Sequence, residues 1–221
     1  MSWTDKKSLE VINKIRDYFQ VDEFIETGTF KGINAKLQSK NFKRVFTCEK
    51  EEKYFDIAYD KLKDCNNIGL YLQDSSKFLK KFTPNGKNRI FYLDAHFYDK
   101  NLKQKFVVID ELRALKGFGD CIIIIHDFDN GLGHINYDGQ PLNLRLIYKY
   151  LMEVNKNFKI YTNELSGCDI KKLEEANDWD EFENLKYAWS KPEKTYRGIL
   201  YVVPKRLPDD FGLKEITWNL I

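Results

Sequence analysis

Short apolar runs that each stop at a polar or acidic residue recur along the first 130 positions of the chain. The first run, Phe24 to Thr27, leads into a turn that contains Gly28 and Gly32. Buried parallel strands are near-continuous apolar runs whose polar ends lie along one edge of a sheet, and such folds bind ligands at that edge. The pattern therefore predicts a parallel sheet with a ligand site at its carboxyl edge. The later runs are Val45-Phe46-Thr47-Cys48-Glu49, Leu72-Gln73-Asp74-Ser75, Phe91-Tyr92-Leu93-Asp94 and Ile123-Ile124-Ile125-His126-Asp127.

Stretches with helical spacing lie between these runs. Leu9, Ile12, Ile15 and Phe19 recur on one face and predict an amphipathic helix over residues 6–19. Strands alternating with helices imply right-handed crossovers and helices on both faces of the sheet. We therefore predict an α/β, doubly wound fold with seven strands. The predicted strands are 24–27, 44–48, 68–72, 90–93, 121–125, 158–162 and 199–203, and the further helices are 32–39, 51–63, 75–82, 105–115 and 142–154.

One long segment interrupts the alternation. Residues 164–197 are dense in charged and aromatic side chains and separate the last two predicted strands. Because structureless stretches of this length are usually functional covers, we predict an excursion or lid here. The loop at 128–141, rich in Gly and Asn, is a second candidate cover. We expect a single domain over residues 1–221, with the helix at 6–19 and the lid as additions to it.

Composition and charge narrow the class of protein. Thirty-six Lys and Arg residues against 34 Asp and Glu leave a formal charge of +2, so we expect neither a nucleic-acid partner nor a membrane. The four cysteines are far apart with no CxxC pair, which argues against disulfides and structural zinc. The first residues lack the apolar core of a signal peptide, and no apolar stretch is long enough to span a bilayer. A soluble, cytoplasmic protein is expected; its oligomeric state is not predicted.

The strand ends favour an adenosine-containing ligand. Gly28 and Gly32 allow a tight turn whose backbone approaches a ligand at a helix start. Glu49 ends the second strand, where a carboxylate can accept both hydroxyl protons of a ribose. Asp74 and Ser75 end the third strand and could bond the edge of an adenine. Each residue alone could equally be a turn or a helix cap, whereas their order together points to a nucleotide.

The residue before the turn distinguishes between adenosine ligands. A dinucleotide fold uses G-x-G-x-x-G, whereas here Gly28 and Gly32 are four apart and Glu26 precedes them. A carboxylate at this point would repel a pyrophosphate and would suit the ammonium of an amino-acid ligand. The turn therefore favours S-adenosylmethionine over NAD.

The chain resembles the class I S-adenosylmethionine-dependent methyltransferases and, among them, the macrocin-type small-molecule O-methyltransferases, over roughly residues 20 to 165. This resemblance implies a Rossmann-like, mostly parallel sheet whose last strand is antiparallel. Phe30 departs from the pattern, because many members carry a third glycine there. The residues that carry the resemblance are Glu26-Thr27-Gly28-Thr29-Phe30-Lys31-Gly32, Glu49, Asp74-Ser75, Leu93-Asp94-Ala95-His96 and Ile125-His126-Asp127. The implied cofactor-binding residues are Glu26, Thr27, Gly28, Thr29, Gly32, Glu49, Asp74, Ser75 and Asp94.

The ends of the fourth and fifth strands supply the candidate catalytic residues Asp94, His96 and His126, with Asp127 beside them. Methyl transfer to oxygen needs a nucleophile held close to the methyl group and a base or metal for its proton. His96 is the predicted base, because histidine titrates near neutral pH. The resemblance implies a divalent metal such as Mg²⁺ on Asp94 and Asp127. Histidines in place of two expected carboxylates would suit a softer metal or none.

Three functions remain open from the sequence. The first is methyl transfer from S-adenosylmethionine to a hydroxyl of a small polar acceptor, such as a sugar. The second is an NAD-dependent oxidoreductase. The third is a nucleotide-binding or partner-binding module without catalysis, since this architecture hosts many activities.

Overall fold

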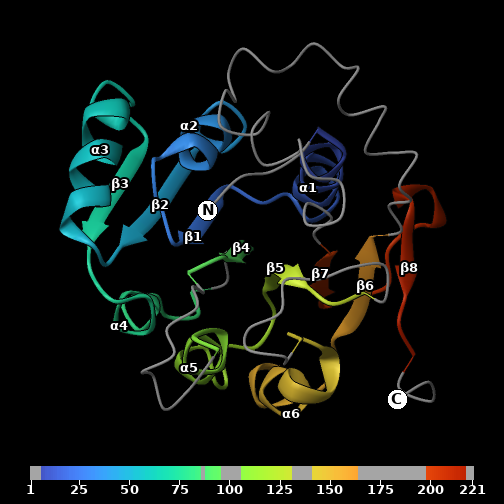
Figure 1. Cartoon of the computed structure of the whole chain (residues 1–221). Helices are drawn as coiled ribbons and strands as arrows, with labels where there is room; N and C mark the ends of the chain where they lie inside the picture. The colour runs from blue at the N-terminus through green and yellow to red at the C-terminus, as the bar shows by residue number, and fades with distance from the viewer. Residues whose placement is uncertain (1–5, 86–87, 96–105, 131–140, 164–197, 218–221) are drawn as a thin grey trace.

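A single mixed sheet organises the chain in the computed structural model, which describes residues 6–85, 88–95, 106–130, 141–163 and 198–217 (Figure 1). The strand order is β3-β2-β1-β4-β5-β7-β6-β8. The strands are β1 (Glu23–Thr27), β2 (Arg44–Glu49), β3 (Ile68–Leu72), β4 (Arg89–Leu93), β5 (Ile122–Phe128), β6 (Lys159–Asn163), β7 (Gly198–Val203) and β8 (Leu213–Glu215). The helices are α1 (Lys6–Phe19), α2 (Ile33–Ser39), α3 (Glu52–Leu62), α4 (Ser75–Leu79), α5 (Val108–Ala114) and α6 (Leu144–Val154), with a short 3-10 helix at Asp209–Phe211.

The topology confirms the predicted doubly wound sheet. Strands β1 to β5 pair in parallel, and β7 is antiparallel to both β5 and β6. All seven predicted strands are present, with bounds that differ by at most one residue except at the end of β5, which runs three residues further than predicted. The eighth strand, β8, was not predicted, because three residues at an edge are too few to show an alternating pattern.

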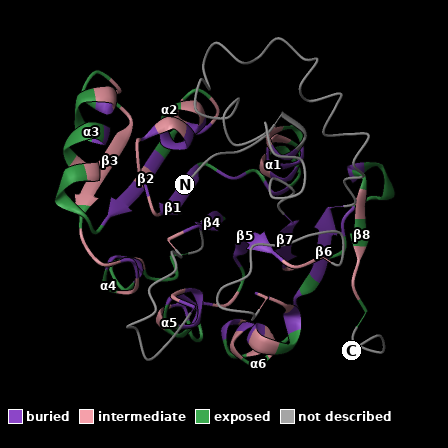
Figure 2. Cartoon of the chain, in the orientation of Figure 1, coloured by how far each residue is buried: buried purple, intermediate pink, exposed green. Residues whose placement is uncertain are grey.

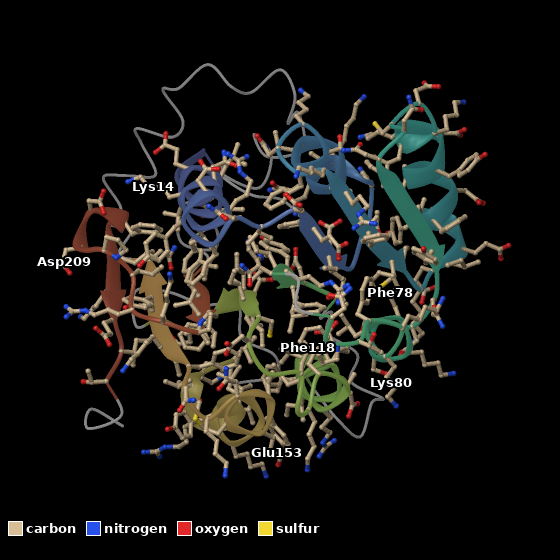
Figure 3. All side chains as sticks on the ribbon, turned by 180° about the vertical axis from the view of Figure 1, so that it is seen from behind. Lys14, Phe78, Lys80, Phe118, Glu153 and Asp209 are labelled. Atoms are coloured by element: carbon tan, nitrogen blue, oxygen red, sulfur yellow. The ribbon has the colours of Figure 1, made fainter. Side chains whose placement is uncertain are left out.

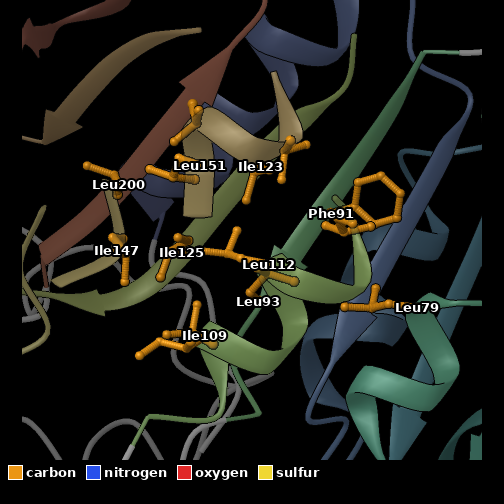
Figure 4. Close-up of a cluster of buried hydrophobic side chains, with 14 of the residues drawn as sticks. Leu79, Phe91, Leu93, Ile109, Leu112, Ile123, Ile125, Ile147, Leu151 and Leu200 are labelled. Carbon is orange, nitrogen blue, oxygen red and sulfur yellow. The ribbon is translucent and has the colours of Figure 1, made fainter. Parts of the chain in front are cut away.

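Alternation along each strand sends side chains to two separate cores. Phe24 of β1 packs with α1, α2 and α3, whereas the next residue, Ile25, packs with α4, α5 and α6. Both faces of the central strands are therefore buried (Figure 2). Figure 4 shows Leu93 of β4 beside Leu112 of α5 within the second core. The long apolar runs in the sequence follow from this double coverage.

The helices expose their polar sides. In Figure 3, Phe78 and Phe118 lie on the inner side of the layer formed by α4, α5 and α6, whereas Lys80 and Glu153 lie on the outside. Among the described residues, no helix combines the length and apolar character needed to cross a bilayer. The single-domain organisation and the lid over 164–197 stay predictions, because that segment lies outside the described residues.

A buried ion pair connects the strands at the amino edge of the sheet, opposite the predicted ligand site. Arg89, at the start of β4, approaches Glu23, at the start of β1, with 2.6 Å between Nε and Oε2. Both side chains are less than a tenth exposed. Arg89 also donates to the Thr83 carbonyl, and Arg44 pairs with the second oxygen of Glu23. This edge is therefore fixed by charges at the starts of three neighbouring strands.

Candidate functional site

The turn after β1 lies tightly against the end of β4. Gly28 has φ +80°, and a Cβ atom there would stand 2.5 Å from the Asp94 carbonyl oxygen. The N–H groups of Gly28 and Thr29 both donate to the Cys48 carbonyl at 3.0 Å. Gly32, with φ +74°, then begins α2. The predicted glycine turn thus brings the ends of β1, β2 and β4 together.

Phe30 occupies a strained position within this turn. Its φ of +50° is in the left-handed region that glycine adopts most easily. A glycine at this position, as expected for the class I methyltransferases that the sequence resembles, would adopt this conformation without strain. The Phe30 N–H donates to Glu49 Oε2 at 2.8 Å, and its ring lies 4.5 Å from the Tyr54 ring, centroid to centroid. These two contacts hold a non-glycine residue in that conformation.

Glu49 connects the end of β2 to the turn. Besides Phe30, its carboxylate accepts from the N–H groups of Lys50 at 2.9 Å and Glu51 at 3.0 Å. A carboxylate oxygen can accept more than one hydrogen bond, so these contacts leave room for further donors. The predicted contact between Glu49 and ribose hydroxyls stays a prediction.

Glu26 belongs to a buried polar network that reaches the turn through Thr47 and Thr29. Its side chain shares a face of β1 with Phe24 and is fully buried under α2. One oxygen accepts from Asn34 at 2.8 Å and the other from the Thr47 hydroxyl at 2.7 Å. Thr47 is also 2.6 Å from the Thr29 hydroxyl. These contacts make Glu26 a support for the turn, and its predicted contact with an ammonium stays a prediction.

Asp74 and Ser75 lie at the start of α4. Asp74 is the N-cap of this helix, because its carboxylate accepts from the Lys77 N–H at 3.2 Å and the Ser76 hydroxyl at 2.7 Å. Burial alone would raise the pKa of Asp74, but these hydrogen bonds outweigh it and lower the pKa. The helix cap, which the sequence left open as another role for Asp74, is therefore present. Ser75 is buried, and its contact with adenine stays a prediction.

Asp94, His126 and Asp127 form a buried cluster at the ends of β4 and β5. His126 Nδ1 lies 3.4 Å from Asp94 Oδ1 and 3.1 Å from Asp127 Oδ1. One ligand-capable atom from each residue lies within 4.8 Å of the other two. The sequence predicted that these residues gather at one edge, and the structure brings all three together. The predicted base, His96, lies outside the described residues.

An irregularity in β5 produces this cluster. The pairing of β5 with β7 shifts register between Ile125 and Phe128, and Asp127 has φ +58°. A Cβ atom on Gly198 of β7 would come within 2.0 Å of the Phe128 carbonyl oxygen, so only glycine fits opposite the bulge. Consecutive residues of a regular strand face opposite ways, whereas here His126 and Asp127 contact each other.

The cluster carries charge at neutral pH. Burial alone would lower the pKa of His126, but the carboxylates of Asp94 and Asp127 outweigh burial and raise the pKa to about 9. His126 is therefore an imidazolium between two carboxylates. This protonation state argues against His126 as a general base near pH 7.

Raising the pH should therefore destabilise the protein through His126. A histidine whose folded pKa exceeds its unfolded value stabilises the fold fully below about pH 6.5 and loses that contribution as the pH rises through about 9. Between pH 7 and pH 10 we expect the urea-derived free energy of unfolding to fall by about 2 to 3 kcal/mol on this account. His126→Asn should show a smaller fall over the same range. Equal falls in both proteins would contradict the assigned charge.

Glu111 of α5 is a buried acid that sequence reasoning missed. It is fully buried, and neither carboxyl oxygen meets hydrogen-bond geometry. Burial raises its pKa to about 7, although the nearby hydroxyls of Thr27 and Ser75 act to lower it. The sequence did contain a signal for its burial: the spacing of Val108, Glu111 and Leu112 places all three on the helix face that packs on the sheet.

No protein-family model and no curated protein sequence matches this chain. Solved structures share its fold. The methyltransferase domain of bacterial CtHen1 aligns with a TM-score of 0.54 and 11% identity, over 90% of this chain and 98% of that one. The plantazolicin methyltransferase BamL, solved with a desmethyl analogue and S-adenosylhomocysteine, gives 0.51 and 11%, over 90% and 84%. The chain has the Rossmann-like methyltransferase fold.

This methyltransferase fold is not confined to enzymes named for methyl transfer. Spermidine synthase from Thermotoga maritima aligns with a TM-score of 0.52 and 12% identity, over 94% of this chain and 62% of that one. At such identities the similarity establishes architecture only. Within the methyltransferase fold, function must be argued from the residues at the carboxyl edge.

Proposed function

We propose that the protein transfers a methyl group from S-adenosylmethionine to a small polar acceptor. The observation that carries the proposal is the turn after β1, which packs its Gly28 backbone on Asp94 and is held by Glu49. In doubly wound folds, nucleotide-like ligands bind outside the carboxyl ends of the strands. The bound S-adenosylhomocysteine of BamL, on the same fold, supports this choice of cofactor.

The buried cluster favours an acceptor hydroxyl, such as one on a sugar. In the transfer, the acceptor oxygen forms a bond to the methyl carbon while the carbon–sulfur bond breaks and its electron pair stays on sulfur. The hydroxyl proton must leave, and the carboxylates of Asp94 and Asp127 are the groups able to accept it, directly or through water. His126, as an imidazolium, holds both carboxylates in place. The role of His96 as base stays a prediction.

The same cluster has a donor set that fits a divalent cation. Asp94, His126 and Asp127 are the residues that would hold it, because their ligand atoms are buried and close together. When bound, such an ion lowers the pKa of a coordinated hydroxyl. It would have to displace the proton on His126, and an imidazole among the ligands favours a softer ion than Mg²⁺. Turnover with added Zn²⁺, compared with turnover with Mg²⁺ and in a chelator, tests this part of the proposal.

Calorimetric titration with S-adenosylmethionine and S-adenosylhomocysteine tests the cofactor. We expect both to bind, and Glu49→Ala to weaken both by about tenfold or more, because a charge-assisted hydrogen bond is lost and the turn is released. The matched control is Glu51→Ala, since Glu51 is an exposed neighbouring acid whose side chain makes no capping bond.

A thermal-melt comparison separates the competing readings. Only a true ligand raises the melting midpoint by mass action, so NAD should leave it unchanged while S-adenosylmethionine raises it. A shift with NAD alone would favour the oxidoreductase. Binding of neither S-adenosyl compound in the calorimeter would remove the proposal.

A further inference from the structure

Glu111 lies beneath the convergence of strand ends that forms the proposed cofactor site. The groups that act on its carboxyl come from three places along the chain: Thr27 ends β1, Asp74 and Ser75 lie at the start of α4, and Asp94 follows β4. Glu111 in turn acts on Cys48 of β2. α5 presents Glu111 to the sheet between Val108 and Leu112, which are fully buried. The carboxyl of Glu111 therefore lies near the residues that end β1 and β4 and begin α4.

This placement is costly without a ligand. A buried carboxyl that lacks good hydrogen bonds loses its solvation, and the carboxylates of Asp94 and Asp74 further oppose its ionisation. Among the residues that the structure describes, no Lys, Arg or His forms an ion pair with Glu111. The immediate surroundings therefore supply acids and hydroxyls but no cation. A positively charged ligand above the strand ends would offset this cost.

The proposed reaction supplies a ligand whose charge changes. The sulfonium of S-adenosylmethionine is positive, and it becomes a neutral thioether when the methyl group leaves. A nearby carboxylate attracts the positive sulfonium and not the neutral thioether. Since the two ligands are otherwise nearly the same, this attraction is what distinguishes them.

We propose that Glu111 is a specificity-determining residue of the cofactor site, whose carboxylate favours the cationic methyl donor over its neutral demethylated product. This inference rests on the proposed function. It assigns to α5 a role in releasing the product, since the attraction disappears with the transferred methyl group.

Binding measurements at pH 8, above the pKa of about 7, test the inference. The measured quantity is the ratio of the dissociation constant of S-adenosylhomocysteine to that of S-adenosylmethionine. Glu111→Gln should lower this ratio by about tenfold, chiefly by weakening S-adenosylmethionine. Sinefungin, which carries an amine in place of the methyl sulfonium, should weaken in the same way. Glu153→Gln removes the same charge from the surface of α6 and should leave the ratio unchanged.

The outcomes separate the two proposals. An unchanged ratio in Glu111→Gln would overturn the inference, whether both ligands bind as before or both weaken equally, because a purely structural role affects both ligands alike. Glu111→Leu, which replaces the buried acid by an apolar side chain, should show the same loss of ratio if the Gln variant fails to fold. Failure of the unaltered protein to bind either ligand would instead overturn the proposed function.

Discussion

Gly28→Ala is expected to abolish cofactor binding and to cost about 3 kcal/mol or more of the free energy of unfolding. A left-handed backbone costs an ordinary residue about 1 to 2 kcal/mol. The added methyl would also stand 2.5 Å from the Asp94 carbonyl oxygen and 2.8 Å from the Ala95 Cα. Both are backbone atoms that no side-chain rotation can move away. The turn and the end of β4 must therefore separate, which opens the proposed cofactor site.

Gly119→Ala is the matched control for this substitution. Gly119 has φ +82°, close to that of Gly28, but a Cβ atom there would meet nothing within 4 Å. It should cost only the conformational penalty of about 1 to 2 kcal/mol and leave cofactor binding unchanged. Urea unfolding and calorimetry of both variants separate backbone conformation from steric exclusion. Equal losses of stability would show that the contact with Asp94 is not tight.

Arg89→Met should cost about 3 to 5 kcal/mol of stability. The substitution removes the buried cationic partner of Glu23 and leaves the half-exposed Arg44 paired with it. Arg44 compensates the charge only in part because it is half-exposed, and a buried carboxylate that loses a buried partner is costly. The loss should be visible in urea unfolding as a shift of the midpoint without a change of slope.

Two further variants calibrate that result. Glu23→Gln combined with Arg89→Met removes the stranded charge and should recover part of the loss. Lys43→Met breaks an exposed pair with Asp22 nearby and should cost less than about 1 kcal/mol. A loss for Arg89→Met no greater than that for Lys43→Met would contradict a structural role for the buried pair.

Much of the fold could be predicted because its strands are buried on both faces. Runs such as Ile122 to Ile125 are apolar throughout, and polar residues follow where each strand reaches the sheet edge. The order of these runs therefore predicted the carboxyl edge, and with it the meeting of Asp94, His126 and Asp127. The strand β8 could not be predicted in this way, since its Leu-Lys-Glu sequence pairs with β6 only through tertiary context.

The details of the site depended on the orientation of individual side chains, which cannot be read from the polar residues that end each strand. Glu26 lies two residues after Phe24 and shares its face, which places the carboxylate under α2 rather than in the turn. The protonation of His126 required two carboxylates on one side of the imidazole, which a regular β5 would not provide. Glu111 was missed because a helix carrying one buried acid looks amphipathic in the usual way.

The bulge of β5 also determines when the site can form as the chain folds. The cluster residues belong to the first 130 positions, but the strand whose glycine accommodates the bulge is β7, which follows much later and inserts between β5 and β6. A nascent chain that ends before Gly198 can pair β1 to β5, yet it lacks the neighbour that places Asp127 beside His126. Assembly of the charged cluster therefore waits for β7, and the unfinished chain holds the turn for the cofactor before the groups proposed to carry out the chemistry are in place.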